Sequence, residues 1–344
     1  MQEEIRTALD QLLLRTDLFQ DDVTQVFGAI MDGRCNDIEI SALLTALAVK
    51  GETEAEVAGA AEAMRHRAAR IPTSRTGLLD TCGTGGDHLS TFNISTATAI
   101  VLAAADVSIA KHGNRKASSS SGSADVLEAM GVNIELSAEQ AGQCLDEIGI
   151  CFCYARLIHG AMKHVAPVRT ALGIRTIFNL LGPLTNPAGA EFQLLGAHSI
   201  ATARKLAGAL ARLNRRRAFV VCGSGQLDEV SLWGRTTVFE VQGDSIQQLE
   251  WAIEDFGLPS CSPQDLEVHS PQESAQVIGN VLAGQSGPAR NTVVANAAAG
   301  LLCVGKVDSL LTGVRLIEGV LDAGLAAEKL RQLVETSQRI AASS

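Results

Sequence analysis

The chain has 344 residues, of which 46% are hydrophobic and 19% charged, and its formal net charge is −10 at pH 7. A chain of this length and composition is expected to form two globular domains with large buried cores. Because its net negative charge repels polyanions, nucleic acid and anionic membranes are poor candidate partners. Any phosphate site must therefore be built locally, from backbone N–H groups and a few cations.

Neither a membrane span nor a signal peptide is predicted. No segment reaches the ~18 uninterrupted apolar residues of a transmembrane helix, and the first residues lack the basic start and apolar core of a signal peptide. The eight cysteines are scattered, with no CxxC pair and no zinc-type spacing. These features predict a cytoplasmic protein whose thiols are reduced.

Residues 1–73 are predicted to form a small domain made only of helices. Apolar residues recur at helical spacing, and two of the segments end at Gly33 and Gly51. Thr53 and Glu56 have the spacing of a capping box, which predicts the start of another helix.

After residue 74 short apolar runs alternate with helical patterns, which favours a mostly parallel α/β sheet flanked by helices. In open sheets of this type, ligands bind beyond the carboxyl ends of the strands. The predicted strands are 77–80, 107–110, 150–153, 192–198, 218–222 and 237–241. The predicted helices include 95–105, 124–130, 201–213, 273–284, 291–303, 308–320 and 324–339.

The first candidate site is the segment DTCGTGGD at 80–87, at the end of a predicted strand. Three glycines in four positions allow close approach of the backbone to a ligand. Hydroxyl side chains follow immediately before a helix begins near Ser95, which is typical of an anion site. Taken alone, a glycine cluster is more often an ordinary tight turn.

The second candidate site is KHGNR at 111–115, which follows another predicted strand and precedes a run of serines that ends at Ser123. Two cations and several hydroxyls on one loop would complement an anion with many oxygens. A charged run is usually a solvated surface and a Ser/Gly run usually a linker, but here apolar elements flank the segment on both sides.

The third candidate site is the pair Asp228 and Glu229, in the loop after the strand at 218–222. Adjacent carboxylates repel each other unless they are exposed or share a divalent cation. Mg²⁺ favours one or two carboxylates completed by waters and substrate phosphates. In isolation such a pair is usually two exposed surface residues. It becomes a candidate metal site only because two phosphate-type loops occur elsewhere at strand ends.

The fourth candidate site runs from His159 to Pro187 and contains Arg169 in a largely apolar stretch. An arginine in such surroundings could bind a substrate carboxylate through two hydrogen bonds, or could be paired internally with an acid. The alternative for His159 and His164 is a hydrogen-bonded structural histidine, and this interpretation is favoured for His164.

Taken together, the motifs GTGGD, TFNIST, KHGNR, SGSADVLE, HGAMKHVAPVR and RTIFNLLGPLTNP, with the later Asp-Glu pair, resemble those of anthranilate phosphoribosyltransferases. The resemblance runs from about residue 5 to 335. It implies a small all-helical domain and a larger α/β domain with a mostly parallel central sheet, working as a cytoplasmic homodimer. The small domain would be residues 1–73 joined by helices from about 155–182, and the large domain 74–154 with 183–344.

The resemblance also implies the substrates, which are phosphoribosyl pyrophosphate and anthranilate, and the cofactor, Mg²⁺ with two ions per active site. The reaction transfers the 5-phosphoribosyl group to the amine of anthranilate in tryptophan biosynthesis. The residues that would bind phosphoribosyl pyrophosphate are Gly83, Gly86, Asp87, Thr91, Asn93, Ile94, Ser95, Thr96, Lys111, His112, Gly113, Asn114, Arg115, Lys116, Ala117, Ser118, Ser119 and Ser123.

Smaller sets are implied for the metal and for the acceptor. Mg²⁺ would be held by Ser95, Asp228 and Glu229, and anthranilate would contact Gly83, Asn114, His159, Met162 and Arg169. No residue is assigned as a general base, so the expected catalytic contribution is electrostatic and comes from Lys111, Asp228 and Glu229. One departure from the family pattern is Ser120, where many relatives carry Lys.

Two alternatives remain open at this point. A pyrimidine nucleoside phosphorylase of the same fold has a similar glycine-rich loop, but it lacks KHGNR and would not need Asp228 and Glu229. A non-enzymatic relative that binds nucleic acid would be expected to have a basic surface and a degraded phosphate loop.

Overall fold

The protein is described from a computed structural model that covers residues 2–87, 89–115 and 121–343. The expected roles of Lys116, Ala117, Ser118 and Ser119, and the departure at Ser120, lie outside the described residues. Among the residues that the structure describes, no helix combines the length and the apolar character needed to cross a bilayer.

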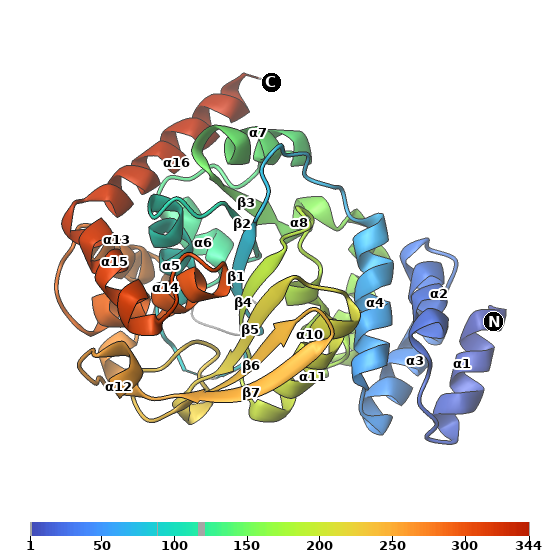
Figure 1. The fold of residues 1–344 in the computed structure, drawn as a ribbon. Coiled ribbons are helices and arrows are strands. Elements are labelled where there is room, and N and C mark those ends of the chain that lie inside the picture. Colours follow the sequence, from blue (N-terminus) through green and yellow to red (C-terminus); the bar gives the residue numbers. More distant parts are fainter. Residues whose placement is uncertain (1, 88, 116–120, 344) are drawn as a thin grey trace.

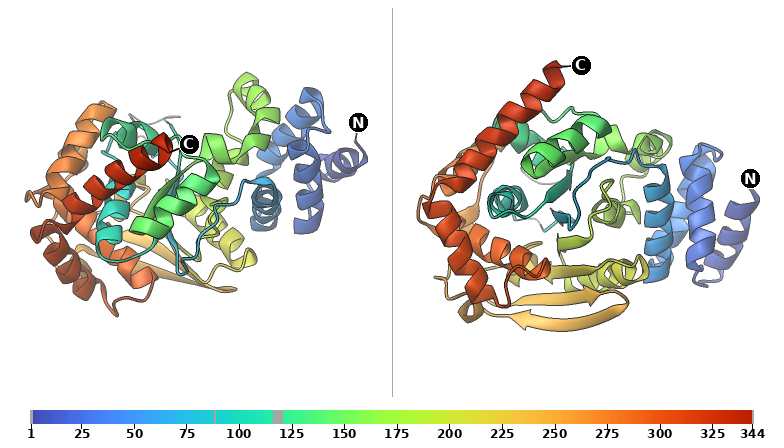
Figure 2. Two further views of the ribbon diagram at one scale, coloured as in Figure 1. Left: turned by 90° about the horizontal axis from the view of Figure 1, so that it is seen from above. Right: turned by 45° about the horizontal axis from the view of Figure 1, so that its top comes forward.

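The N-terminal part is a bundle of helices that lies at one end of the molecule (Figures 1 and 2). Both α3 and α4 begin with a capping box, which satisfies N–H groups that have no partner within the helix. The box predicted at Thr53 and Glu56 is therefore confirmed. The helices are α1 (Glu3–Leu13), α2 (Gln20–Met31), α3 (Asp37–Lys50) and α4 (Glu54–Arg67).

The rest of the chain is built on a seven-stranded sheet with the order β3-β2-β1-β4-β5-β6-β7. The first five strands in this order pair in parallel, whereas β6 pairs antiparallel with β5 and β7 pairs antiparallel with β6. The mostly parallel sheet is therefore confirmed. The strands are β1 (Leu79–Gly83), β2 (Ile109–Gly113), β3 (Ile150–Tyr154), β4 (Phe192–Gly196), β5 (Arg217–Cys222), β6 (Thr236–Gln242) and β7 (Ser245–Trp251).

Helices cover both faces of this sheet (Figure 1). The longer ones are α5 (Ile94–Ala104), α7 (Ala138–Ile148), α11 (Ile200–Arg212), α13 (Pro271–Leu282), α14 (Pro288–Cys303), α15 (Leu310–Asp322) and α16 (Leu325–Ala342). The shorter ones are α6 (Ser123–Ala129), α8 (Ala155–Ile158), α9 (Ala166–Leu172), α10 (Phe178–Leu181) and α12 (Ile253–Phe256). Single 3₁₀ turns are η1 (Gly160–His164), η2 (Gly182–Leu184), η3 (Ser224–Gln226) and η4 (Pro263–Leu266).

Alternate residues of the central strands β4 and β5 enter two different hydrophobic cores, because successive side chains of a strand point to opposite faces. Leu194 and Val221 belong to the core that also contains α5 and α14. Leu195 and Val220 belong to the second core, which continues through α11 into the helical bundle. One face of the sheet is therefore packed against the N-terminal helices.

The segment between β3 and β4 packs against the N-terminal bundle. Val165, Val168 and Phe178 lie in the same hydrophobic core as α2 and α4, and the rings of Phe27 and Phe178 are 5.6 Å apart. The domain boundaries expected at 73, 154 and 182 stay a prediction, but this packing brings the segments 1–73 and 155–182 together.

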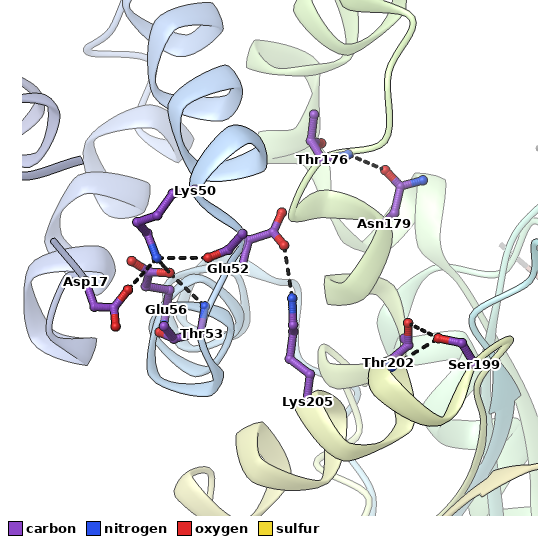
Figure 3. A network of polar contacts seen from close by, with 11 residues as sticks. Asp17, Lys50, Glu52, Thr53, Glu56, Thr176, Asn179, Ser199, Thr202 and Lys205 are labelled. Carbon is purple, nitrogen blue, oxygen red and sulfur yellow. Dashed lines mark hydrogen bonds and ion pairs between the residues drawn. The ribbon is translucent and has the colours of Figure 1, made fainter. Parts of the chain in front are cut away.

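Polar contacts also connect the bundle to the α/β part (Figure 3). Lys205 of α11 forms an ion pair with Glu52, with 3.2 Å between Nζ and Oε2. Within the bundle, the Lys50 ammonium contacts the carboxylates of Asp17 at 2.6 Å and Glu56 at 3.0 Å. Helices α4 and α11 also contact each other directly, which joins the two parts.

One strand was not predicted from the sequence. β7 forms a hairpin with β6 through Gly243 and Asp244, and most of its side chains are exposed. Because β7 is mostly polar, a search for apolar runs does not find it. The two-residue turn that contains glycine is nevertheless a signal for a hairpin.

Candidate active site

The candidate loops lie where the strand order of the sheet reverses. β1 has β2 on one side and β4 on the other, so its carboxyl end is the topological switch point at which open α/β sheets bind ligands. β1 and β4 end at Gly83 and Gly196. A Cβ atom at either glycine would collide with Asp228, so the absence of side chains there lets the acidic loop cross the two strand ends.

Three carboxylates gather beside this crossing. Burial and then repulsion from Asp87 raise the pKa of Asp228 to about 7. Burial, followed by the charge of Asp228, holds the pKa of Glu229 well above its usual range. Burial also raises the pKa of Asp87. Buried acids that repel one another are stabilised by a cation.

The carboxylates are partly positioned by the glycine-rich loop. The backbone N–H of Gly85 donates to Asp228 Oδ2 at 2.7 Å, and that of Leu89 donates to Asp87 Oδ1 at 3.2 Å. Within residues 2–87, 89–115 and 121–343, no three His, Cys, Asp or Glu side chains form a ready metal cage. Asp228 and Glu229 are the carboxylates that could hold Mg²⁺, which commonly takes one or two carboxylates completed by waters and substrate phosphates.

Lys111 is a buried residue of β2 and not part of an exposed loop. Its ammonium donates to the Thr81 carbonyl at 2.6 Å and to Ser95 Oγ at 3.2 Å. Burial lowers its pKa, while the charges of Asp80 and Glu229 act in the opposite direction. The ammonium therefore fixes the start of α5 and opposes the negative charge of the acidic cluster.

Several expected phosphate-site residues surround the start of α5. Asn93 Oδ1 accepts hydrogen bonds from the hydroxyls of Ser121 at 2.5 Å and Ser274 at 2.8 Å. Ile94 is the first residue of the helix, and Ser95 and Thr96 lie in its first turn. Among the described residues the buried Thr96 hydroxyl has no hydrogen-bond partner. The N–H groups of Ile94 and Thr96 donate to the carbonyls of Phe92 and Asn93, and a backbone hydrogen bond from Ser95 counteracts the rise in the pKa of Glu229. The positive end of a helix favours such anions.

The residues of the KHGNR segment after Lys111 have different surroundings. His112 faces a cavity, Asn114 Oδ1 accepts from the Arg115 N–H at 2.8 Å, and a Cβ at Gly113 would collide with Ser123 Oγ. The Arg115 guanidinium is bound to the acids of α6, at 3.1 Å from Asp125 and 2.8 Å from Glu128. Thr91 is placed by a bridge to Glu267.

The residues expected to contact the acceptor line one cavity of about 720 Å³ between the ends of β1 and β2 and the segment 155–185. They are Gly83, Asn114, His159, Met162 and Arg169. Phe178, His112 and Cys82 also line it. The cavity therefore brings together residues that lie up to 121 positions apart in the sequence, from Met64 to Thr185.

Arg169 has no internal acidic partner in this cavity. In the described part of the chain no carboxylate lies within 4.0 Å of its guanidinium, which sits 5.4 Å above the centre of the Phe178 ring. Burial alone lowers the pKa of Arg169. A half-buried cation on an aromatic ring, without a counter-ion, is suited to binding an aromatic carboxylate.

Two histidines form a hydrogen-bonded pair at the wall of the same cavity. His112 Nδ1 lies 3.0 Å from the Gly182 carbonyl, and its Nε2 lies 3.1 Å from His159 Nε2. Because a carbonyl only accepts, His112 carries its proton on Nδ1 and accepts from His159 on Nε2. His159 is thereby fixed with an unprotonated Nδ1.

The chain resembles known proteins over nearly its whole length. Residues 6–68 match the model of the glycosyl transferase family helical bundle domain, and residues 75–327 match that of the glycosyl transferase family a/b domain. The anthranilate phosphoribosyltransferase of Desulforamulus reducens is 46% identical over 336 residues, which cover 98% of this chain and 97% of that protein.

Solved structures agree as well. The crystal structure of anthranilate phosphoribosyltransferase from Thermus thermophilus has a TM-score of 0.91 and 41% identity, covering 96% of this chain and 99% of that one. The Saccharomyces cerevisiae enzyme in complex with PRPP and Mg has a TM-score of 0.91 and 26% identity, covering 98% and 99%. The chain belongs to the anthranilate phosphoribosyltransferase family.

Two side chains near the site of this anthranilate phosphoribosyltransferase family member were not singled out from the sequence. Arg175, from the segment before α10, crosses to the glycine-rich loop, where a Cβ at Gly86 would lie 2.6 Å from its Nη1. His198 follows β4, and its Nδ1 lies 3.2 Å from Thr84 Oγ1. Arg175 begins the motif RTIFNLLGPLTNP, but the motif alone does not show that its side chain reaches the glycine-rich loop. No local motif marks His198.

The histidine pair predicts how stability depends on pH in this transferase. Burial lowers the pKa of His112 to about 4 and that of His159 to about 3, from 6.5 in the unfolded chain. The unfolded state therefore binds protons first, and stability present above pH 6.5 is lost as the pH falls toward 4. For His112 alone the shift is worth roughly 3 kcal/mol.

Urea unfolding measured between pH 7 and pH 4.5 tests this expectation. The decrease in unfolding free energy should be smaller in a His112→Asn variant, whose side chain does not titrate but can still donate to the Gly182 carbonyl. An equal decrease in the variant and the parent protein would show that the pair does not control the pH dependence.

Lys111 gives a second prediction. Replacement of Lys111 by Met, which preserves most of the buried volume, removes the donor that holds Ser95 and the cation that faces Glu229. The apparent KM for phosphoribosyl pyrophosphate is expected to rise roughly ten- to hundredfold, the range of a lost charge-assisted contact. Steady-state kinetics with each substrate varied should show a much smaller change for anthranilate, and an unchanged donor KM would refute the assignment.

Proposed function

We propose that the protein transfers the 5-phosphoribosyl group of phosphoribosyl pyrophosphate to the amine of anthranilate, giving N-(5-phosphoribosyl)anthranilate and pyrophosphate, as a cytoplasmic enzyme of tryptophan biosynthesis. The observation that carries this proposal is the cavity that contains the unpaired Arg169 and reaches Gly83, next to the acidic cluster. It offers an acceptor site and a donor site side by side.

On the donor side, the loops after β1 and β2 and the start of α5 supply N–H groups and hydroxyls for the phosphates. The described residues proposed to contact phosphoribosyl pyrophosphate are Gly83, Gly86, Asp87, Thr91, Asn93, Ile94, Ser95, Thr96, Lys111, His112, Gly113, Asn114, Arg115 and Ser123. His112 and Arg115 have other partners in the structure, so their direct contribution is the smallest.

For the metal, we propose that Ser95, Asp228 and Glu229 hold Mg²⁺, with two ions per active site. The buried, mutually repelling carboxylates fit such ions. When bound, Mg²⁺ supplies positive charge for the departing pyrophosphate. Ser95 is kept in position by Lys111 and by the hydroxyl of Thr81, which donates to the Ser95 carbonyl at 3.0 Å.

On the acceptor side, Arg169 binds the carboxylate of anthranilate and so directs the amine toward ribose C1. The lone pair of the amine forms the C–N bond as the bond between C1 and the pyrophosphate oxygen breaks, and the nitrogen then loses one proton to solvent water. An aromatic amine needs no deprotonation before attack, so no general base is assigned. Orientation of the two substrates and electrostatic stabilisation of the leaving group carry the catalysis.

The proposal is tested against the nucleoside phosphorylase alternative by supplying two substrate pairs to the same preparation. With anthranilate, phosphoribosyl pyrophosphate and Mg²⁺, pyrophosphate release should equal anthranilate consumption. With thymidine or uridine and phosphate, no free base should form. Phosphorolysis without consumption of anthranilate would reverse the assignment.

We also propose that the protein is a homodimer through α1 and α3. The face of α3 opposite the bundle core carries the exposed Ile38 and Val49, and α1 adds Leu13. Together these helices line an apolar surface groove of about 910 Å³. A helix that is apolar on both faces is normally covered on both.

Changing Ile38 and Val49 together to Asp should convert the dimer to a monomer, since two buried charges in a symmetric interface would face their copies. Light scattering coupled to size-exclusion chromatography gives the mass directly. An exposed apolar residue outside this groove, Ile246, provides the matched control when changed to Asp. A double variant that keeps the mass of the parent protein would exclude this interface.

A further inference from the structure

A second cavity lies at the opposite end of the strands from the active site. Its volume is about 950 Å³, and it is formed by the segments that precede β1, β4 and β5 together with the last turns of α4 and α11. In Figure 1 this is where the chain leaves α4 and crosses to β1. The cavity therefore lies where the helical bundle meets the α/β part.

This cavity is rich in arginine although the chain as a whole has a net charge of −10. Only two acids, Glu62 and Glu139, line it. Its arginines are Arg65, Arg70, Arg75, Arg212 and Arg215. The local charge is thus opposite to that of the protein, which is the arrangement that attracts anions into a cleft.

Two of these arginines are held close to each other in the wall. Arg215 is 7% exposed, and both its Nε and the Nη2 of Arg65 are buried without a hydrogen-bond partner in the part of the chain that the structure describes. Burial and then the charge of Arg215 lower the pKa of Arg65 to about 9. In the described residues neither guanidinium has a carboxylate within 4.0 Å, so their repulsion is not offset by an ion pair.

Other groups of the protein stabilise these arginines only in part. Arg65 Nε donates to the Leu184 carbonyl at 2.6 Å, and Arg215 donates to the Ala190 carbonyl. Arg75 is bound to the carbonyl of Asp146. The carboxyl ends of α4 and α11 favour nearby cations, but this effect is worth at most ~1 kcal/mol at an exposed site. The charges of Glu62 and Asp80 raise the pKa values of Arg65 and Arg215 respectively, but burial outweighs this attraction and both pKa values are lowered.

We propose that this cavity binds a small, multiply charged oxyanion of the phosphate or pyrophosphate class, between Arg65 and Arg215, with Arg70 and Arg212 at its mouth. Guanidinium groups bind such oxyanions through paired hydrogen bonds. Arg65 belongs to α4 of the bundle and Arg215 follows α11 of the α/β part, so the bound anion bridges the two. The site is separate from the donor site, which lies at the carboxyl ends of the strands.

The test is the thermal stability and binding calorimetry of the whole protein, titrated with inorganic phosphate and, separately, with pyrophosphate. The anion should raise the melting temperature of the parent protein. The double variant Arg70→Gln/Arg212→Gln, which alters only exposed side chains, should bind that anion about tenfold or more weakly, the loss expected for charge-assisted contacts. Comparing the two anions identifies which one the cavity prefers.

The matched control is Arg235→Gln/Arg331→Gln, which removes the same charge from exposed positions far from the cavity. It should bind the anion as the parent protein does. A third variant, Arg65→Met, should be at least as stable as the parent protein without anion, because one of two repelling cations is gone, yet should gain less from added anion. The KM for phosphoribosyl pyrophosphate should stay within about twofold in Arg70→Gln/Arg212→Gln if the two sites are distinct.

Equal anion affinity in the parent protein, the cavity variants and the control would overturn the proposal. The proposal would also be overturned if Arg70→Gln/Arg212→Gln weakened anion binding and raised the KM for phosphoribosyl pyrophosphate by the same factor. The anion would then be occupying the donor site. Neither result would alter the proposed transferase reaction, which depends on residues at the other end of the sheet.

Discussion

Changing Asp228 to Asn together with Glu229 to Gln is expected to lower kcat by roughly a thousandfold or more, since several kcal/mol of charge stabilisation on the leaving group would be lost. The fold should persist. Both carboxylates are buried with raised pKa values, so their neutral amides remove repulsion rather than a stabilising ion pair. Turnover measured over a range of Mg²⁺ concentrations, with unfolding measured in parallel, tests both statements.

A matched control for this double change is Asp244→Asn/Glu250→Gln, which makes the same substitutions at exposed positions of the β6–β7 hairpin. It should leave turnover unaffected. Near-normal turnover of the Asp228/Glu229 variant at limiting Mg²⁺ would remove these residues from the metal site.

Replacing Arg169 with Ala should raise the apparent KM for anthranilate by about one hundredfold, and leave the KM for phosphoribosyl pyrophosphate within a few fold. A hydrogen-bonded pair of charges of this kind is worth ~1.5–3 kcal/mol, and an unpaired carboxylate in the apolar cavity adds to the loss. Arg169→Lys should recover little of the affinity because the two-pronged geometry is lost. Steady-state kinetics with each substrate varied in turn give the comparison.

Arg204 offers a control for the effect of the ring contact. Its guanidinium also lies 5.4 Å above an aromatic ring, that of Phe239, but outside the cavity. Arg204→Ala should therefore change the stability without changing either KM. If Arg169→Ala raises the KM for both substrates equally, or only lowers the melting temperature, then Arg169 is structural and the nature of the acceptor is open again.

The fold was largely predictable because its strands are buried on both faces. β3 (Ile150–Tyr154) and β5 (Arg217–Cys222) appear in the sequence as short apolar runs. The helices that precede these two strands, α7 and α11, begin at the caps Ser137 and Ser199 and show helical periodicity. β7 was missed because its exposed, polar side chains give neither an apolar run nor a clean alternation. The strand after 107 was placed too early: β2 is Ile109–Gly113, so Lys111 lies in the strand and not in the loop.

The site was predictable only in its local parts. Glycines, hydroxyl side chains and paired acids at the ends of strands can be recognised in the sequence, because few sites other than phosphate and metal sites need these residues together. The contact between His112 and His159 spans 47 positions, and that between Gly86 and Arg175 spans 89, so no local pattern could reveal either. The arginine cavity beside α4 was hidden for the same reason, because each arginine alone resembles a solvated helix end.

The fluorescence of anthranilate, followed while phosphoribosyl pyrophosphate and Mg²⁺ are added in turn, tests the central claim most directly. The signal should stay constant with either addition alone and decline only when both are present, with one pyrophosphate released for each anthranilate consumed. A constant signal with both present, from folded protein that still binds the donor, would contradict the assignment of this chain as an active anthranilate phosphoribosyltransferase.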